Sequence, residues 1–282
     1  MLESAVGVDL GGTKALFVAG PHAMRFDTGP AFSPADFAAT LASFIASTRL
    51  RPSHLGIAVP GLVDAAGRVV ACDVLPALAG WQPAAALGHL GCAVAVVNDA
   101  QAALLDELHD APAGLTAGVV MVGTAIGAAF LAHGAPLRGT SGWAGELGYF
   151  PCAVGPEIMR LDEVAGGAAM AARRGVGPAQ LAALALAADP ESLAVIRAGG
   201  SALGAGLAAV INLLNPSRLA LGGGAVDLPG YRQAAERTAR QFSVPALWND
   251  CTLGPIASGE RVVALGALRA ALAQPGAAAP SP

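Results

Sequence analysis

Short apolar runs alternate along this chain with longer stretches in which apolar residues recur at helical spacing. Strands are predicted within residues 6–20, 55–61, 67–73, 93–99 and 218–224. Helices are predicted after Ser33-Pro34, from Ala100, over residues 231–241 and over residues 260–272. Further helical stretches are predicted between residues 134 and 218. This alternation is typical of an α/β fold.

The two halves of the chain begin in the same way. Residues 6–20 (VGVDLGGTKALFVAG) and residues 119–134 (VVMVGTAIGAAFLAHG) each give an apolar strand, a Gly/Thr turn and a second apolar strand. We therefore predict a two-lobed fold with a nucleotide cleft between the lobes. The predicted divisions are an N-terminal lobe over residues 1–112, a larger C-terminal lobe over 113–258, a C-terminal helix over 259–273 that packs back on the first lobe, and a disordered tail over 274–282.

Residues 115–132 form the most membrane-like segment, because they carry no charge and are nearly long enough to span a bilayer. Gly123, Thr124 and Gly127 divide the segment into two pieces of strand length. A buried β-hairpin is therefore the preferred interpretation, and a membrane-inserted helix is the alternative.

The charge balance narrows the range of partners. The formal net charge is −4 and the arginines are scattered, so there is no electrostatic reason to expect nucleic acid or an anionic membrane as a partner. The early apolar run is interrupted by Asp9 and Lys14, which is unlike a signal peptide. The four cysteines are widely spaced, and we expect free thiols in a reducing, cytoplasmic compartment.

The break in the first hairpin is the first candidate site. It reads Asp9-Leu-Gly11-Gly12-Thr13-Lys14, and Lys14 is the only lysine among sixteen basic residues. A Walker A loop needs Gly-Lys-Ser/Thr before a helix, whereas Thr13 precedes Lys14 here and a strand follows. One interpretation is a turn whose missing β-carbons let backbone N–H groups approach phosphate oxygens. The alternative is a β-turn that simply requires glycine.

Asp99 is the second candidate. It directly follows a predicted strand and precedes a predicted helix, so it lies at the carboxyl end of a strand, where open α/β sheets bind their ligands. A carboxylate there can accept the proton of an attacking hydroxyl. The alternative is that Asn98-Asp99 only caps the helix.

Six segments in order give the chain a resemblance to the ROK family, the bacterial sugar kinases and related repressors of the actin-like, or hexokinase-like, ATPase superfamily. These segments are VDLGGTK at the start, GIAVPGLVD at 56–64, LPALAGW at 75–81, VVNDAQAALLDE at 96–107, GELG at 145–148 and INLLNPSRLALGGG at 211–224. Because the chain starts almost directly at the phosphate hairpin, the resemblance implies a kinase rather than a repressor with a DNA-binding segment.

The resemblance implies an actin-like fold and an ATP- and magnesium-dependent kinase that phosphorylates a hexose or modified hexose. It makes Asp99 the catalytic base, and Asp9 the residue that holds Mg²⁺ through water. It assigns phosphate or nucleotide binding to Gly11, Gly12, Thr13, Lys14, Gly123, Thr124, Gly222, Gly223 and Gly224. It assigns sugar binding to Asn98, Glu146 and Gly61, and it implies a homodimer.

The sequence departs from the family pattern around the sugar. Tyr149 stands where the family usually has a histidine that binds sugar and zinc, and only Cys152 remains of the family's cysteine cluster. We therefore predict no structural zinc and expect Tyr149 to bind sugar. Asp162 takes the place of a sugar-binding glutamate, and Val74 that of a sugar-binding asparagine.

The second phosphate loop is also altered, because GTAIGAA at residues 123–129 has alanines where bare backbone is typical. A sugar kinase is the first hypothesis. A catalytically weak sugar- or nucleotide-binding regulatory protein is the alternative, although the presence of both Asp9 and Asp99 argues for chemistry.

Overall fold

The computed structural model describes residues 4–274, so most of the predicted disordered tail lies outside the described residues. The chain divides into two compact units. Unit 1 contains residues 4–109, 138–144 and 257–274 of the described part, and unit 2 contains residues 110–137 and 145–256. The connection 138–144, which interrupts unit 2 in sequence, therefore belongs to unit 1.

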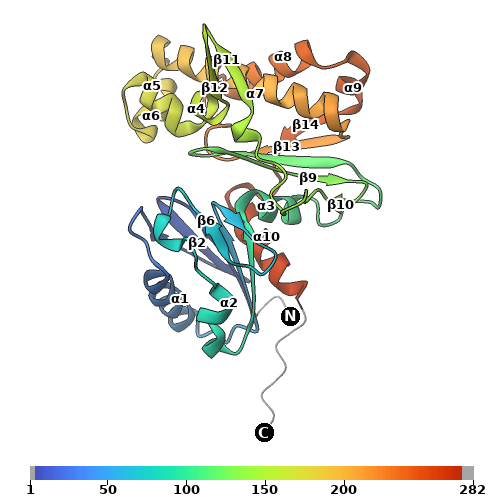
Figure 1. The fold of residues 1–282 in the computed structure, drawn as a ribbon. Coiled ribbons are helices and arrows are strands. Elements are labelled where there is room, and N and C mark those ends of the chain that lie inside the picture. Colours follow the sequence, from blue (N-terminus) through green and yellow to red (C-terminus); the bar gives the residue numbers. More distant parts are fainter. Residues whose placement is uncertain (1–3, 275–282) are drawn as a thin grey trace. The chain divides into compact units, whose positions relative to one another are not determined.

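Unit 1 is built on a five-stranded sheet (Figure 1), and the order of its strands is β3-β2-β1-β4-β7. Its strands are β1 (Ala5–Leu10), β2 (Lys14–Ala19), β3 (His22–Asp27), β4 (His54–Val59) and β7 (Ala93–Asn98). β1, β2 and β3 pair antiparallel, whereas β1, β4 and β7 run parallel. The carboxyl ends of β1, β4 and β7 therefore lie at one edge of the sheet.

Helix α1 (Pro34–Thr48) covers the aromatic side of this sheet. The helix predicted after Ser33-Pro34 begins at Pro34, and Ser33 is its N-cap: the Ser33 side chain accepts a hydrogen bond from Asp36 N–H, and the Asp36 carboxylate accepts one from Ser33 N–H. Phe37 and Phe44 of α1 pack on Phe17 of β2, with ring centroids 5.9 and 5.5 Å apart. These rings are fully buried and form the centre of the core of unit 1.

The remaining elements of unit 1 are short or lie on the other side of the sheet. They are β5 (Leu62–Val63), β6 (Val69–Ala71), α2 (Pro83–Ala86), α3 (Asp99–Glu107), α10 (Val262–Leu272) and the 3-10 turns η2 (Pro76–Leu78), η3 (Gly88–Leu90) and η5 (Gly259–Arg261). The strand predicted at 67–73 shrinks to β6, which pairs only with β5 in a separate two-stranded sheet.

Helix α10 returns to unit 1 and packs on β1, β4 and α3 (Figure 1). The contact is close because glycines face it. A β-carbon on Gly7 would lie 2.0 Å from Ala264 O, one on Gly56 would lie 1.8 Å from Ala267 O, and one on Gly266 would lie 1.7 Å from Ala102 O. Glycine is thus required on both sides of α10 for space.

An ion pair ties α10 to α3. Arg269 Nε lies 2.7 Å from Oδ1 of Asp106, and the Asp106 residue is only 3% exposed. We expect Arg269→Met to lower the free energy of unfolding by about 3 kcal/mol, because it leaves a buried carboxylate without its cation.

Urea unfolding of the wild type and of the variant measures this loss. The matched control is Arg232→Met, which removes an exposed ion pair to Glu236 (3.7 Å) and is expected to cost less than about 1 kcal/mol. Equal losses in the two variants would show that the α3–α10 pair has no special role in stability.

Unit 2 is built on a second five-stranded sheet, with the order β10-β9-β8-β13-β14. Its strands are β8 (Ala117–Val122), β9 (Ile126–Ala132), β10 (Ala135–Pro136), β13 (Arg218–Gly222) and β14 (Thr252–Pro255), and β11 (Pro151–Val154) pairs with β12 (Glu157–Arg160) in a separate hairpin. β8 and β9 are antiparallel, while β8, β13 and β14 run parallel. Residues 117–132 thus form the predicted buried hairpin.

The helices of unit 2 are α4 (Asp162–Ala165), α5 (Gly167–Arg174), α6 (Pro178–Leu186), α7 (Pro190–Leu214), α8 (Tyr231–Phe242) and α9 (Pro245–Asp250), and η4 (Leu147–Tyr149) is a 3-10 turn. Among the described helices, α7 is long and apolar enough to cross a membrane by length and composition. Leu203, Leu207 and Ile211 of α7 are fully buried in the core of unit 2, which accounts for its apolar character.

Candidate active site

The Gly-Gly-Thr turn of unit 1 is held by hydrogen bonds from inside and outside the hairpin. Gly11 N–H donates to Lys14 O (2.9 Å) and closes the turn. Thr28, which follows β3, donates its hydroxyl to Gly11 O (2.6 Å) and its N–H to Thr13 O (3.0 Å). Thr13 and Lys14 themselves stay exposed at the tip. The turn is therefore a fixed loop with an accessible hydroxyl and an accessible amine.

The glycines of this turn are required for space. A β-carbon on Gly12 would lie 2.6 Å from Cγ1 of Val74, and one on Gly11 would lie 2.9 Å from Lys14 O. Neither glycine has a left-handed φ. Val74, which stands in place of the sugar-binding asparagine of the family pattern, thus packs against the Gly-Gly-Thr turn.

Two carboxylates lie at the carboxyl edge of the parallel strands. Asp9 is near the end of β1, and Asp99 follows the end of β7 as the first residue of α3. Burial first, and the charge of Asp99 second, raise the pKa of Asp9 to about 7, and the Lys14 amine opposes this rise. Asp9, Asp99 and Lys14 therefore form one electrostatic group, although Asp99 lies far from the other two in sequence.

The sequence left open whether Asn98-Asp99 only caps a helix, and the hydrogen bonds assign the cap to Asn98. Asn98 is the N-cap of α3, since its Oδ1 accepts from the N–H groups of Ala100 (2.9 Å) and Gln101 (3.3 Å), while its Nδ2 donates to Gly61 O (3.0 Å). Asp99 lies one position later, and its Oδ1 also accepts from Ala100 N–H (2.8 Å). The helix is capped by Asn98, so capping alone does not explain Asp99.

The second turn, in unit 2, has a similar construction. Gly123 N–H donates to Ala125 O (3.0 Å), and Gly123 O accepts from the N–H of Gly167 at the start of α5 (2.8 Å). Thr124 O accepts from Ala168 N–H (3.2 Å), while the residues 123–125 remain exposed. Ala128 and Ala129, the later alanines of this motif, lie in β9 and are buried. The turn itself therefore departs from the family pattern only by the methyl group of Ala125.

The three glycines after β13 differ in their surroundings. Gly222 is buried, and a β-carbon there would meet Ile256 and Met121 side chains. Gly223 has a φ of +92°, and its β-carbon would lie 2.4 Å from Val122 O. Gly224 is exposed with open space beside it, so it is the one whose backbone a ligand can approach.

A third group in unit 2 gathers around η4 and the start of α4. Glu146 precedes η4, Tyr149 ends it, and Asp162 begins α4. Desolvation first, and the charge of Asp162 second, raise the pKa of Glu146. The pKa of Asp162 is also raised, mainly by burial, while Arg160 opposes the rise. Glu146 and Asp162, both named from the sequence, therefore lie close enough for the charge of one to act on the other, whereas Arg160 was not named from the sequence.

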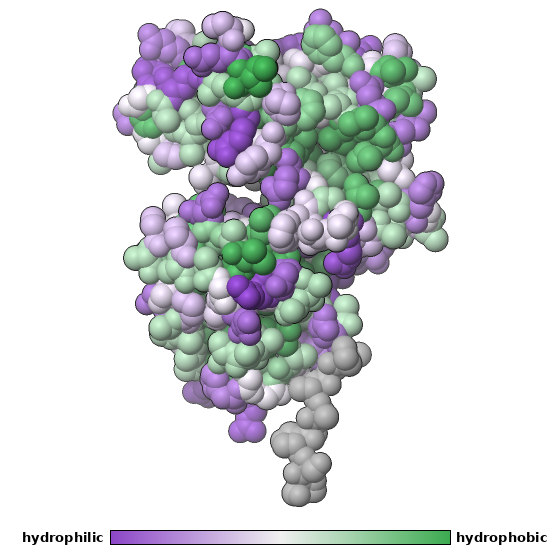
Figure 2. Space-filling model, viewed as in Figure 1, coloured by the Kyte–Doolittle hydropathy of each residue, from purple (hydrophilic) through white to green (hydrophobic). Residues whose placement is uncertain are grey.

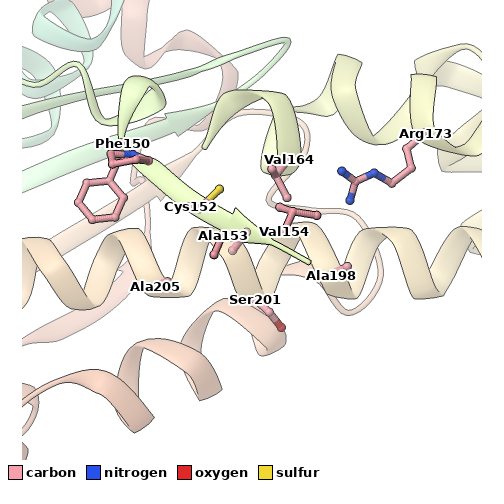
Figure 3. Close-up of a pocket in the computed structure, with 11 residues that line it drawn as sticks. Phe150, Cys152, Ala153, Val154, Val164, Arg173, Ala198, Ser201 and Ala205 are labelled. Carbon is pink, nitrogen blue, oxygen red and sulfur yellow. The ribbon is translucent and has the colours of Figure 1, made fainter. Parts of the chain in front are cut away.

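A cavity of about 560 Å³ in unit 2 adjoins the third group, because Phe150 and Val164 are among its lining residues. It is open to solvent and lies between the β11–β12 hairpin and α7 (Figure 3). Its lining is mostly small and apolar, with Arg173 and Ser201 at its side. No converging polar groups mark it as a catalytic pocket, so the candidate active site rests on the carboxylates and turns above.

The comparisons with known proteins agree with these motifs. The sequence profile of the ROK family matches residues 5–274. The chain belongs to the ROK family. It is 28% identical over 304 residues to a kanosamine kinase from Amycolatopsis mediterranei (strain S699), which covers 94% of this chain and 97% of that protein.

Solved structures show the same ROK fold. A ROK hexokinase from Thermus thermophilus matches with a TM-score of 0.77 and 26% identity, covering 95% of this chain and 97% of that one. A ROK family glucokinase from Streptomyces griseus, in complex with glucose and AMPPNP, matches with a TM-score of 0.79 and 20% identity, covering 95% and 99%. The fold is therefore the actin-like, hexokinase-like α/β fold that the sequence indicated.

In this ROK protein, the residues named from sequence gather in three groups. Unit 1 brings together Asp9, the turn residues 11–14, Gly61, Asn98 and Asp99 at one sheet edge. Unit 2 holds the turn at 123–124 and the glycines 222–224 against the same strand β8, and it holds Glu146, Tyr149 and Asp162 around η4. Sequence reasoning missed two supporting residues, Thr28 and Arg160.

Proposed function

We propose that this ROK protein is a sugar kinase that transfers the γ-phosphoryl group of ATP to a hydroxyl of a hexose or modified hexose, with Mg²⁺. The family and the kinase relatives support phosphotransfer to a sugar. The observation that carries the proposal is the electrostatic pairing of Asp9 with Asp99 at the carboxyl edge of the parallel strands. Phosphoryl transfer requires this combination of a proton acceptor and a metal-holding carboxylate.

Asp99 is proposed as the general base. Its carboxylate accepts the proton of the sugar hydroxyl as that hydroxyl attacks the γ-phosphorus. Asn98 caps α3 and is hydrogen-bonded to Gly61, so the neighbouring backbone is fixed. This fixed edge supports the position of Asp99, and Asn98 and Gly61 beside it are proposed to contact the sugar.

The donor set fits magnesium. Among the described residues, no group of three or more His, Cys, Asp or Glu side chains could hold a metal ion. Mg²⁺ does not need such a cage, because it keeps several waters and binds one or two carboxylates together with substrate phosphates. Asp9 is proposed to hold it through water, and the bound ion neutralises charge on the phosphates.

The other groups are proposed to bind the rest of the two substrates. The exposed turn tips at Thr13, Lys14, Gly123 and Thr124, with the backbone of Gly11 and Gly12, bind phosphates. The Gly222-Gly223-Gly224 turn binds the adenosine through the open backbone at Gly224, while Gly222 and Gly223 let the turn pack closely on its neighbours. Glu146, Tyr149 and Asp162 bind hydroxyls of the sugar, since carboxylates accept and a phenol both donates and accepts hydrogen bonds.

We also propose a cytoplasmic homodimer. Apolar and polar residues are interspersed on the visible surface of each unit (Figure 2). Asn212 bonds to the backbone of Phe242 and Val244 (both 2.9 Å), and the nearby side chains of Leu213, Phe242 and Val244 are largely exposed. These apolar side chains support an interface between copies, and light scattering of the purified chain measures its mass.

ADP release from ATP and Mg²⁺ across hexoses, amino sugars including kanosamine, and N-acetyl sugars tests the activity. We expect at least one sugar to raise ADP release well above the rate with water alone, and mass spectrometry of that reaction to show a sugar phosphate. ATP binding without stimulation by any sugar would instead support the regulatory protein.

A further inference from the structure

Arg160, the last residue of β12, makes three charge-based contacts in unit 2. The centre of its guanidinium group lies 4.6 Å from the centroid of the Tyr149 ring. Its Nε lies 3.3 Å from Oδ1 of Asp162, and its Nη2 lies 3.2 Å from Oε1 of Glu163. The Arg160 N–H also donates to Oε2 of Glu163 (2.9 Å). One side chain thus contacts an aromatic ring and two carboxylates.

These contacts join the two segments that carry the proposed sugar-binding residues. Tyr149 lies in η4, three residues after Glu146, and Asp162 lies in the first turn of α4. Between them the chain leaves for the β11–β12 hairpin and returns, and Leu161 N–H donates to Phe150 O (2.8 Å) at the hairpin base. Arg160 adds a side-chain connection directly at the sugar-binding side chains.

The hairpin itself gets little positional support from the core. No residue from 151 to 160 is buried, and residues of both β11 and α7 line the 560 Å³ cavity (Figure 3). Close packing normally fixes the position of a segment, and it is weak here. The contacts of Arg160 therefore have a larger share in holding Tyr149 and Asp162 in place.

The charges around Asp162 give Arg160 a second role. The charge of Asp162 raises the pKa of Glu146, the charge of Glu163 raises that of Asp162, and Arg160 supplies the cation of the group. Neither Arg160 Nε nor Asp162 Oδ1 makes a hydrogen bond within the described residues, so charge holds this pair together. The positive charge of Arg160 partly neutralises the carboxylates of Glu146, Asp162 and Glu163. Without Arg160, these carboxylates would attract cations more strongly.

We propose that Arg160 is the positioning and specificity-determining residue of the sugar site: it holds Tyr149 and Asp162 in one arrangement and reduces the preference of the site for positively charged amino sugars. This inference rests on the proposed sugar-kinase function. It assigns to Arg160 an effect on the sugar and none on the ATP.

A spectroscopic experiment tests the contact without any need for activity. The chain has two tyrosines, and Tyr231 is fully buried with its hydroxyl donating to Ala165 O (2.8 Å). Labelling with 3-fluorotyrosine therefore gives two fluorine NMR lines, which Tyr149→Phe assigns. We expect Arg160→Met to move the Tyr149 line toward that of free fluorotyrosine. The Tyr231 line stays in place and shows that the variant is folded.

Arg173→Met is the matched control, because it removes an arginine that lines the cavity beside the same hairpin. We expect it to leave the Tyr149 line unchanged. If Arg160→Met also left that line unchanged, the proposed positioning by Arg160 would be wrong.

Kinetics test the consequence for the sugar. For Arg160→Met we expect the KM of a neutral hexose such as glucose to rise roughly tenfold while the KM of ATP stays within about twofold. The ratio of kcat/KM for glucosamine to that for glucose should rise by roughly three- to tenfold, because the removed charge repelled the ammonium group. Arg160→Lys should keep the wild-type ratio, and Arg173→Met should keep both KM values.

Equal losses for both sugars in Arg160→Met, with an unchanged ratio, would overturn the specificity role and leave only a structural one. If the wild type phosphorylates no sugar, the proposed function fails. In that case the fluorine spectra, with glucose and glucosamine added in turn, still decide the inference: it is refuted unless Arg160→Met raises the affinity for glucosamine relative to glucose.

Discussion

Asp99→Asn is expected to lower kcat/KM for sugar phosphorylation by about 10²- to 10⁴-fold, the usual contribution of a general base. The amide has the same shape as the carboxylate, and it can still accept the hydrogen bond from Ala100 N–H. Because Asn98 caps α3 in both proteins, the helix should remain stable. The loss therefore reports on proton transfer and not on folding, and steady-state ADP release measures it.

The same variant has a second expected signature. The charge of Asp99 helps to raise the pKa of Asp9, so its removal lowers that pKa and leaves more of Asp9 ionised near pH 6 to 7. We therefore expect Asp99→Asn to bind Mg²⁺ and ATP at least as tightly as the wild type while turnover collapses. Calorimetric titration with Mg²⁺ and a non-hydrolysable ATP analogue measures this binding.

Asp73→Asn is the control for loss of a nearby negative charge, because Asp73, like Asp99, acts electrostatically on Cys72. It should retain turnover within about threefold, which is expected of an exposed carboxylate outside the proton transfer. A comparable loss in Asp73→Asn, or full activity in Asp99→Asn, would refute the role of Asp99 as base.

The elements that local sequence determines were predictable. Both Gly/Thr turns stand out because an apolar strand lies on each side of them. Helix α1 begins at Pro34 because Ser33 caps it in a capping box and proline suits the first helical position. Strand β3 was missed because it is an edge strand whose exposed His22 and Arg25 break the apolar pattern. Strands β13 and β14 show the same contrast: β13 is apolar and mostly buried and was predicted, whereas β14 is short and partly exposed and was not.

The site was predictable where chemistry and position in the chain agree, and less so where tertiary contacts decide. Asp99 could be proposed because it follows a strand, but only the hydrogen bonds of Asn98 show which residue caps the helix. Thr28 follows a strand that was missed, so its bonds to the Gly-Gly-Thr turn had no sequence signal. Arg160 likewise contacts Tyr149 across a hairpin that periodicity did not predict.

Asp9→Asn is expected to lower kcat/KM by about 10²-fold or more at limiting Mg²⁺, because it removes the carboxylate proposed to hold the ion. In the wild type, Asp9 has a pKa of about 7 without metal, and metal ligands bind in their deprotonated form. Below pH 7 the apparent affinity for Mg²⁺ should therefore fall, by up to roughly tenfold per pH unit, and above pH 8 it should level off.

Magnesium titrations of ADP release from pH 6.0 to 8.5 measure this dependence in the wild type, Asp9→Asn and Asp27→Asn. ATP itself binds protons in this range, but it does so equally in all three reactions, so the difference between the curves isolates Asp9. Asp27 faces Lys14 across β2 and β3 and should leave the wild-type curve in place when it is changed. A wild-type curve parallel to that of Asp9→Asn would mean that Asp9 is ionised throughout this range or takes no part in binding the metal, and the electrostatic pairing with Asp99 would then lose its place in the mechanism.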